Sequence, residues 1–321
     1  MNYTTIIIIA IVGIIIGYLL ARRRKEGLTV WTNEKKEVNE ISEKEVRLNV
    51  NLGEVGGGIM KNEEVVETYY DYAISKILDK LPKSIKIADF GGAHGFLSKF
   101  IKNRLEKNGK TVDVVVIDEN TKELAEADAK GLKTLKANIE NISLEDKQDL
   151  IIMRFVLHYN SLEGINNILG NVKKSLKESG YFINQVNSGR DKNHVDMINN
   201  IVNMPSLGRV NKNRMNYLTK DEYLDISNKH GFVTEIFDKD INGKPLSWNW
   251  TLKDMFERSN GKFDKISESK KREYLENKKT FLNDTEKLIK EYQEKYNIDY
   301  VKYEGEDTNI EFHIPIFLSH L

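Results

Sequence analysis

Small residues lie between a predicted strand and a predicted helix, directly after an acidic residue. Residues 87–101 read IADFGGAHGFLSKFI, so that Asp89 is followed by residues 91–95, of which three are glycine, before apolar residues resume at helical spacing. Glycine lets the backbone turn tightly and approach another molecule closely. We therefore expect this loop to pass very close to a ligand that is not protein.

The spacing of the glycines distinguishes two classes of cofactor. Dinucleotide sites use the pattern G-x-G-x-x-G, which residues 91–95 do not fit. The loop fits the pattern acid-x-G-x-G-x-G better, with Asp89 as the acid and Ala93 in place of the middle glycine. If the middle position needs a positive φ, alanine there costs about 1 kcal/mol.

The elements that would position this loop alternate between strand and helix. Near-continuous apolar strands are predicted at residues 85–90, 111–119, 132–139, 148–158 and 181–187, and helices at 62–81, 95–109, 121–131 and 162–180, the last of them ended by Gly180. This alternation predicts an α/β fold with a parallel sheet covered on both faces. Ligands of such sheets bind at the carboxyl ends of the strands, where the glycine loop lies.

Six segments of the chain, in this order, resemble the class I S-adenosylmethionine-dependent methyltransferases over about residues 62–240. They read IADFGGAHG, VVVIDEN, KANIENI, DLIIMRFVLHYN, LKESGYFINQV and YLTKDEYLDISNKHGFVTEIF. The resemblance implies a Rossmann-like, doubly wound and mostly parallel sheet of seven strands, the last of them antiparallel. It also implies S-adenosylmethionine as the cofactor and methyl transfer as the reaction.

Cofactor-binding roles follow from the resemblance residue by residue. The loop would pass under the methionine half of the cofactor, Asp89 would help to hold its amino group, and Asp118 would accept hydrogen bonds from both ribose hydroxyls. Asn138 and Ile139 would border the adenine, and Arg154 and Phe155 would line the donor methyl group and the acceptor. The full cofactor set is Asp89, Gly91, Gly92, Ala93, His94, Gly95, Asp118, Asn138, Ile139, Arg154 and Phe155. Purely structural roles remain open, such as Asp118 as the N-cap of the next helix and Asn138 as an ordinary turn residue.

Candidates for the chemistry of the acceptor are fewer. His158 and Tyr159 are the candidate catalytic bases, and a packed, structural histidine is the alternative for His158. Candidate acceptor-binding residues are Tyr69, Tyr70, Arg190 and His194. The histidines are scattered and no carboxylate cluster has ligand spacing, so we expect no metal site.

The first residues differ in character from the rest of the chain. Residues 3–21 carry no charge and are followed by three arginines and a lysine at 22–25. About 18 to 20 apolar residues span a bilayer as a helix, and the positive-inside rule would place the N-terminus outside and the catalytic domain in the cytosol. We expect residues 1–25 to form a single-pass membrane anchor, with a cleaved signal peptide or a buried core helix as alternatives. Residues 26–61 would form a polar tether, unless residues 46–50 add an edge strand.

Two globular segments should follow the tether. Residues 62–240 would form the cofactor-binding domain, and residues 241–321 a helical insertion or cap with a final edge strand.

The 49 basic and 49 acidic residues balance, so a nucleic-acid acceptor is not expected, and the absence of cysteine excludes disulfides and a cysteine nucleophile. The favoured function is a membrane-tethered methyltransferase for a small or lipid-like acceptor. The alternatives are a methyltransferase acting on a protein partner and an inactive scaffold with the same fold.

Overall fold

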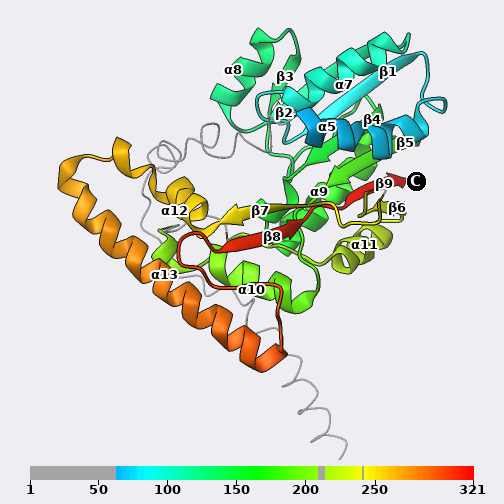
Figure 1. Ribbon diagram of the computed structural model, residues 1–321. Coiled ribbons are helices and arrows are strands. Elements are labelled where there is room, and N and C mark those ends of the chain that lie inside the picture. Colours follow the sequence, from blue (N-terminus) through cyan, green and yellow to red (C-terminus); the bar gives the residue numbers. More distant parts are fainter. Residues whose placement is uncertain (1–62, 209–213, 241) are drawn as a thin grey trace, which may run out of the picture. The chain divides into compact units, whose positions relative to one another are not determined.

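The computed structural model describes residues 63–208, 214–240 and 242–321, which belong to one compact unit (Figure 1). The predicted membrane anchor and tether lie outside these residues. Among the residues that are described, no helix is both long enough and apolar enough to cross a bilayer.

A seven-stranded sheet forms the centre of this unit. Its strands are β1 (Ser84–Phe90), β2 (Thr111–Asp118), β3 (Lys133–Lys136), β4 (Gln148–Arg154), β5 (Leu176–Gln185), β6 (Val233–Phe237) and β9 (Ile316–His320). They are arranged in the order β3-β2-β1-β4-β5-β9-β6. Strands β1 to β5 pair in parallel, and β9 pairs antiparallel with both β5 and β6. The predicted mostly parallel, seven-stranded α/β sheet with an antiparallel last strand is confirmed.

The last strand does not lie at the edge of the sheet, where we had predicted it. Strand β9 is inserted between β5 and β6, and β6 forms the edge. Ile316 and Leu318 pack into the core on one face, and Phe317 into the core on the other. A strand that is apolar on both faces is stable only where both faces are covered, whereas the partly exposed β6 tolerates the edge.

Helices cover both faces of the sheet. One face carries α5 (Glu63–Tyr69), α7 (Phe96–Lys107) and α8 (Thr121–Ala129). Helix α5 continues through the π-helical turn η2 (Tyr70–Ile74) into α6 (Ser75–Ile77) on the same face. The other face carries α9 (Leu162–Ser175) and α11 (Lys220–Lys229). In β1, Ile85 and Ile87 point to the first face and Ala88 and Phe90 to the second, as alternation along a strand requires.

The helix predicted to end at Gly180 is shorter than expected. Helix α9 ends at Ser175, and β5 begins at Leu176 and contains Gly180. A Cβ atom on Gly180 would lie 3.0 Å from the carbonyl oxygen of Gln148 and 2.9 Å from the Leu176 side chain. Glycine is therefore required here for close approach within an irregular strand pair and not as a helix terminator.

A second core lies beyond the carboxyl end of β5 and forms a cap. It is built from α10 (Lys192–Val202), η4 (Pro205–Leu207), α12 (Leu252–Asn260), η5 (Phe263–Lys265), the long α13 (Glu268–Tyr296), and the antiparallel pair of β7 (Ser247–Thr251) and β8 (Asn309–His313). Residues 195–217 share this core with residues 250–312. Part of the segment that we assigned to the cofactor domain thus packs as cap, and residues 316–320 return from the cap to the main sheet.

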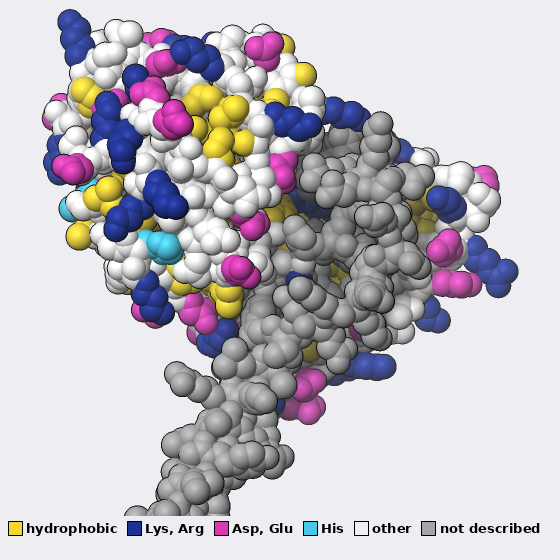
Figure 2. Space-filling model, turned by 180° about the vertical axis from the view of Figure 1, so that it is seen from behind, with side chains coloured by type: hydrophobic (Ala, Val, Ile, Leu, Met, Phe, Trp, Pro, Cys, Tyr) yellow, Lys and Arg dark blue, Asp and Glu magenta, His cyan; other side chains and the backbone are white. Residues whose placement is uncertain are grey.

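Charges of both signs are mixed over the described surface that is visible from behind. Figure 2 shows lysine and arginine side chains next to acidic ones on this face, with only small apolar patches between them. A continuous basic stripe, which a nucleic-acid surface would need, is not seen on the described part of this face.

Candidate functional site

The loop after β1 adopts the left-handed turn that its glycines suggested. Gly91 and Gly95 have φ values of +75° and +70°, and Ala93 between them has φ +46°. The amides of Gly91 and Gly92 donate to the carbonyl of Ile117 on β2, at 2.8 and 3.2 Å. The middle position therefore does need a positive φ, and Ala93 adopts it at a cost of about 1 kcal/mol.

The glycines of this loop are surrounded by the chain's own side chains. A Cβ atom on Gly91 would lie 2.7 Å from the Val156 side chain, and one on Gly95 would lie 2.6 Å from that of Leu132. A Cβ atom on Gly92 would lie 2.5 Å from the Asp89 carboxyl carbon. We had predicted that the loop approaches a ligand closely. At these three glycines the close neighbours are instead side chains of the protein itself.

Asp118 joins the end of β2 to the loop. One of its carboxylate oxygens accepts a hydrogen bond from the amide of Ala93 at 3.0 Å, and the other accepts one from the amide of Asn120 at 2.8 Å. The N-cap of α8 is Asn120, so the alternative role of Asp118 as that N-cap is wrong. An ionised carboxylate has about four acceptor positions, so Asp118, which is only partly buried, can still accept further hydrogen bonds.

Three buried ionisable residues lie near the loop, and we call Asp89, Arg154 and Tyr69 the buried charged group. Asp89 is 1% exposed and accepts a hydrogen bond of 2.6 Å from the hydroxyl of Ser98 on α7. Arg154, at the end of β4, and Tyr69, on α5, are also buried and interact electrostatically with it. Burial raises the pKa of Asp89 to about 7, although Ser98 and Arg154 act in the opposite direction. Burial likewise lowers the pKa of Arg154 to about 10.

Asp89 makes the stability of the fold depend on pH. Its pKa is 3.8 when exposed and about 7 when folded, so the folded state binds more protons between these values. The free energy of unfolding should therefore fall as pH rises from 4 through 7, by on the order of 4 kcal/mol from this group alone.

Urea titrations at pH 5, 6, 7 and 8 would measure this loss. In Asp89→Asn, which keeps an oxygen for the Ser98 hydroxyl, the decline between pH 5 and 8 should be much smaller. Equal declines in the two proteins would contradict the assignment.

The end of β4 is strained and leads into aromatic residues. Phe155 has φ +58°, and its amide donates to the carbonyl of Gln185 at 2.8 Å. Strained residues persist only where the surroundings hold them, and they cluster at functional sites. His158 follows in the short turn η3 (Leu157–Tyr159) and is 2% exposed, with its ring stacked 4.8 Å from that of Tyr217. Its packing fits the structural role that we left open, and its role as a base stays a prediction.

The predicted adenine-side residues are engaged in local structure. The side-chain oxygen of Asn138 accepts a hydrogen bond from the amide of Glu140 at 2.7 Å, which makes Asn138 a turn residue. Ile139 is 8% exposed and packs in the core that also holds Ile117. His94 is 8% exposed, and its Nδ1 atom lies 3.8 Å from a carboxylate oxygen of Glu123.

The predicted acceptor residues divide into three places. Tyr69 lies at the buried charged group and donates to the carbonyl of Ile183 at 2.8 Å. Tyr70 packs instead against Arg104 of α7. Arg190 and His194 lie in the cap, where Arg190 pairs with Glu311 on β8 and burial lowers the pKa of His194 to about 4.

Some residues of the site were missed by the sequence reasoning. Ser98 lies on the apolar stripe of α7 with Ile101 and Leu105, and a polar residue on such a stripe was a usable signal. Arg258, whose Nη2 donates to the Tyr159 hydroxyl at 3.0 Å, gave no such signal because it is 99 residues away.

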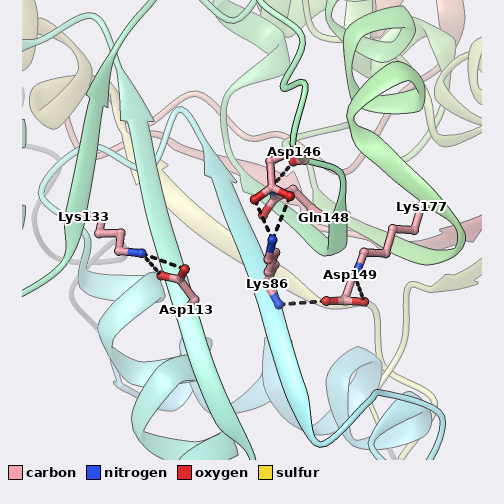
Figure 3. A network of polar contacts seen from close by, with 7 residues as sticks. All are labelled: Lys86, Asp113, Lys133, Asp146, Gln148, Asp149 and Lys177. Carbon is pink, nitrogen blue, oxygen red and sulfur yellow. Dashed lines mark hydrogen bonds and ion pairs between the residues drawn. The ribbon is translucent and has the colours of Figure 1, made fainter.

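A hollow among the described residues lies at the opposite ends of the strands. Its volume is about 230 Å³, and it is lined by residues that include Lys86, Asp113, Lys133, Asp146 and Gln148, near the amino ends of β1 to β4. Its lysines are paired: Figure 3 shows Lys133 with Asp113 and Lys86 with Asp146, in each case at 2.7 to 2.8 Å. Ligands of doubly wound sheets bind at the carboxyl ends, so we do not place the site here. The described residues also contain no group of three or more potential metal ligands.

No protein-family model and no curated protein sequence matches the chain. Solved structures do match. A proposed methyltransferase from Bacillus halodurans C-125 superposes with a TM-score of 0.56 at 15% identity, covering 79% of this chain and 97% of its own. The YcgJ protein of Bacillus subtilis superposes with a TM-score of 0.51 at 13% identity, covering 78% and 97%. The fold is that of the class I methyltransferases. An S-adenosylmethionine-dependent methyltransferase from Clostridium acetobutylicum also matches, at 15% identity over 56% of this chain and 85% of its own, with a TM-score of 0.42.

Proposed function

We propose that this chain is an S-adenosylmethionine-dependent methyltransferase. The observation that carries the proposal is the contact between Asp118 and the loop after β1: an acid at the end of the second strand holds the left-handed turn in place through the amide of Ala93. The fold shared with a proposed methyltransferase supports the same conclusion.

The groups at this site fit the polar parts of the cofactor. Asp118 has acceptor capacity left for two ribose hydroxyls. The N-cap of helix α7 is Gly95, which has no side chain to cap it, whereas α8 to α12 each have a capping side chain. The first amides of α7 therefore remain to bind the carboxylate of the methionine part. Asp89, buried beside Gly92, places a carboxyl group on the side where an amino group would lie.

Bound S-adenosylmethionine would supply an electrophilic methyl carbon, which leaves the chain mainly the work of alignment. The loop and Asp118 hold the nucleoside end. The strained Phe155 and the turn at Leu157–Tyr159 form the wall on the acceptor side. Tyr159 is partly buried and is the candidate base, which could take a proton from an acceptor only in its deprotonated form.

We also propose a location for the enzyme and a class of acceptor. The uncharged residues 3–21 and the basic residues 22–25 support a membrane anchor with the catalytic domain in the cytosol. An anchored enzyme would act on a small or lipid-like acceptor near the bilayer.

Calorimetry on the full-length chain tests the proposal. S-adenosylhomocysteine should bind with micromolar affinity, and NAD should not bind at the same concentration. Binding of NAD without binding of S-adenosylhomocysteine would indicate hydride transfer, and not methyl transfer, as the reaction. Binding of neither compound would favour an inactive scaffold.

A further inference from the structure

Arg258 of the cap lies directly beside the acceptor side of the proposed site. Its Nη2 donates to the hydroxyl of Tyr159 at 3.0 Å, and Tyr159 follows β4 by only five residues. The guanidinium also lies 5.2 Å from the centre of the Trp250 ring, and Trp250 lies 5.5 Å from the partly exposed Trp248. Helix α12 thus brings a cation and apolar aromatic surface to the end of the fourth strand.

The positive charge of Arg258 is not balanced by an acid among the described residues. Arg104, Arg190 and Arg272 form ion pairs with Glu67, Glu311 and Glu276, respectively, but no carboxylate of a described residue lies within ion-pair distance of Arg258. Its neighbours, a phenol and an indole ring, orient the guanidinium without neutralising it. A partly desolvated guanidinium of this kind binds an anion more strongly than one in water does.

One nitrogen of the guanidinium remains open. Nε is buried without a hydrogen-bond partner, and Nη2 donates to Tyr159. Nη1 is not buried and has no hydrogen bond to another described residue, so it can donate to an oxygen of a ligand. A planar guanidinium held by two aromatic groups is well suited to carboxylate or phosphate.

We propose that the methyl acceptor is an anionic molecule with an apolar body, and that Arg258 binds its carboxylate or phosphate group. Trp248 and Trp250 would contact the apolar body. The assignment of this molecule as the methyl acceptor rests on the proposed function, but the anion site itself can be tested without the cofactor.

The experiment measures thermal shifts of the full-length chain with benzoate, phenyl phosphate and the neutral benzamide, with and without saturating S-adenosylhomocysteine. The two anions should stabilise the chain and benzamide should not. In Arg258→Met the affinity for the anions should fall by at least about tenfold, since a charge-assisted pair is lost. Tyr159→Phe, which removes only the hydroxyl that orients Arg258, should lower it by several-fold.

The matched control is Arg272→Met, in which an exposed arginine of α13 is replaced. Anion affinity should not change in this variant. Soluble dioctanoyl phosphatidate distinguishes the source of a phosphate group: tighter binding than that of phenyl phosphate indicates a lipid, and weaker binding a small metabolite.

The proposal is overturned if Arg258→Met and Tyr159→Phe both retain wild-type anion affinity. Should Arg258→Met not fold, Tyr159→Phe and Arg258→Lys decide the question, because lysine keeps the charge but not the planar fork. Loss of anion binding with intact S-adenosylhomocysteine binding supports the acceptor assignment. Anion binding that depends on Arg258, without any S-adenosylhomocysteine binding, would refute the proposed function and not the anion site.

Discussion

Asp118→Ala should abolish measurable binding of S-adenosylhomocysteine, with a loss of affinity of about a hundredfold or more. Each hydrogen bond from a hydroxyl to a carboxylate contributes about 1.5–3 kcal/mol, and two would be lost together. The substitution also removes the acceptor for the amide of Ala93, at 3.0 Å, which helps to hold the left-handed turn. Calorimetry on the purified variant measures the effect.

Asp113→Ala is the matched control for this variant. Asp113 lies on the same strand, near its amino end, and pairs with the exposed Lys133 at 2.7 Å. Its replacement should leave the affinity unchanged and the stability within about 0.5 kcal/mol. If Asp118→Ala binds S-adenosylhomocysteine as the wild-type chain does, the ribose does not lie at the end of β2.

The positions of Asp89 and Asp118 could be predicted because they depend on local patterns. Asp118 is the last residue of β2 and Asp89 the last but one of β1, and the carboxyl ends of parallel strands meet at one edge of the sheet. Whether Ala93 needs a positive φ was left open by the sequence, and the structure shows that it does. The side chains against which the loop packs could not be predicted from the local pattern, because Val156 and Leu132 come from elsewhere in the chain.

The cap and the buried charged group depend on contacts between distant residues. The place of β9 between β5 and β6 is decided by burial of Ile316 and Phe317 on two faces after a long excursion through the cap. The electrostatic interaction of Asp89 with Arg154 requires the register of β1 against β4, in which Asp89 lies opposite Ile152. A sequence pattern carries no information on such a register, so the interaction of Arg154 with Asp89 was not predicted, and the place of Arg154 beside the donor methyl group stays a prediction.

Arg154→Met should be the most destabilising substitution at the site. Arg154 is buried at the end of β4, on the same face as Asp89 and Tyr69. Asp89 and Arg154 interact electrostatically, and removing one of two opposite buried charges costs about 3–5 kcal/mol where the other stays ionised. The pKa of Asp89 should then rise further above its value of about 7. Urea unfolding monitored by circular dichroism measures the loss.

The dependence of this loss on pH separates charge from packing. At pH 5 Asp89 is protonated in the folded state, so Arg154→Met should cost less there than at pH 8, where the carboxylate would be ionised in the wild-type chain. The double variant Arg154→Met with Asp89→Asn should recover part of the stability at pH 8, because it removes both charges. Arg272→Met, at an exposed position of α13, should change the stability by no more than about 0.5 kcal/mol at either pH. A loss that is equal at pH 5 and pH 8 would mean that Arg154 stabilises the fold through the packing of its side chain and not by balancing Asp89.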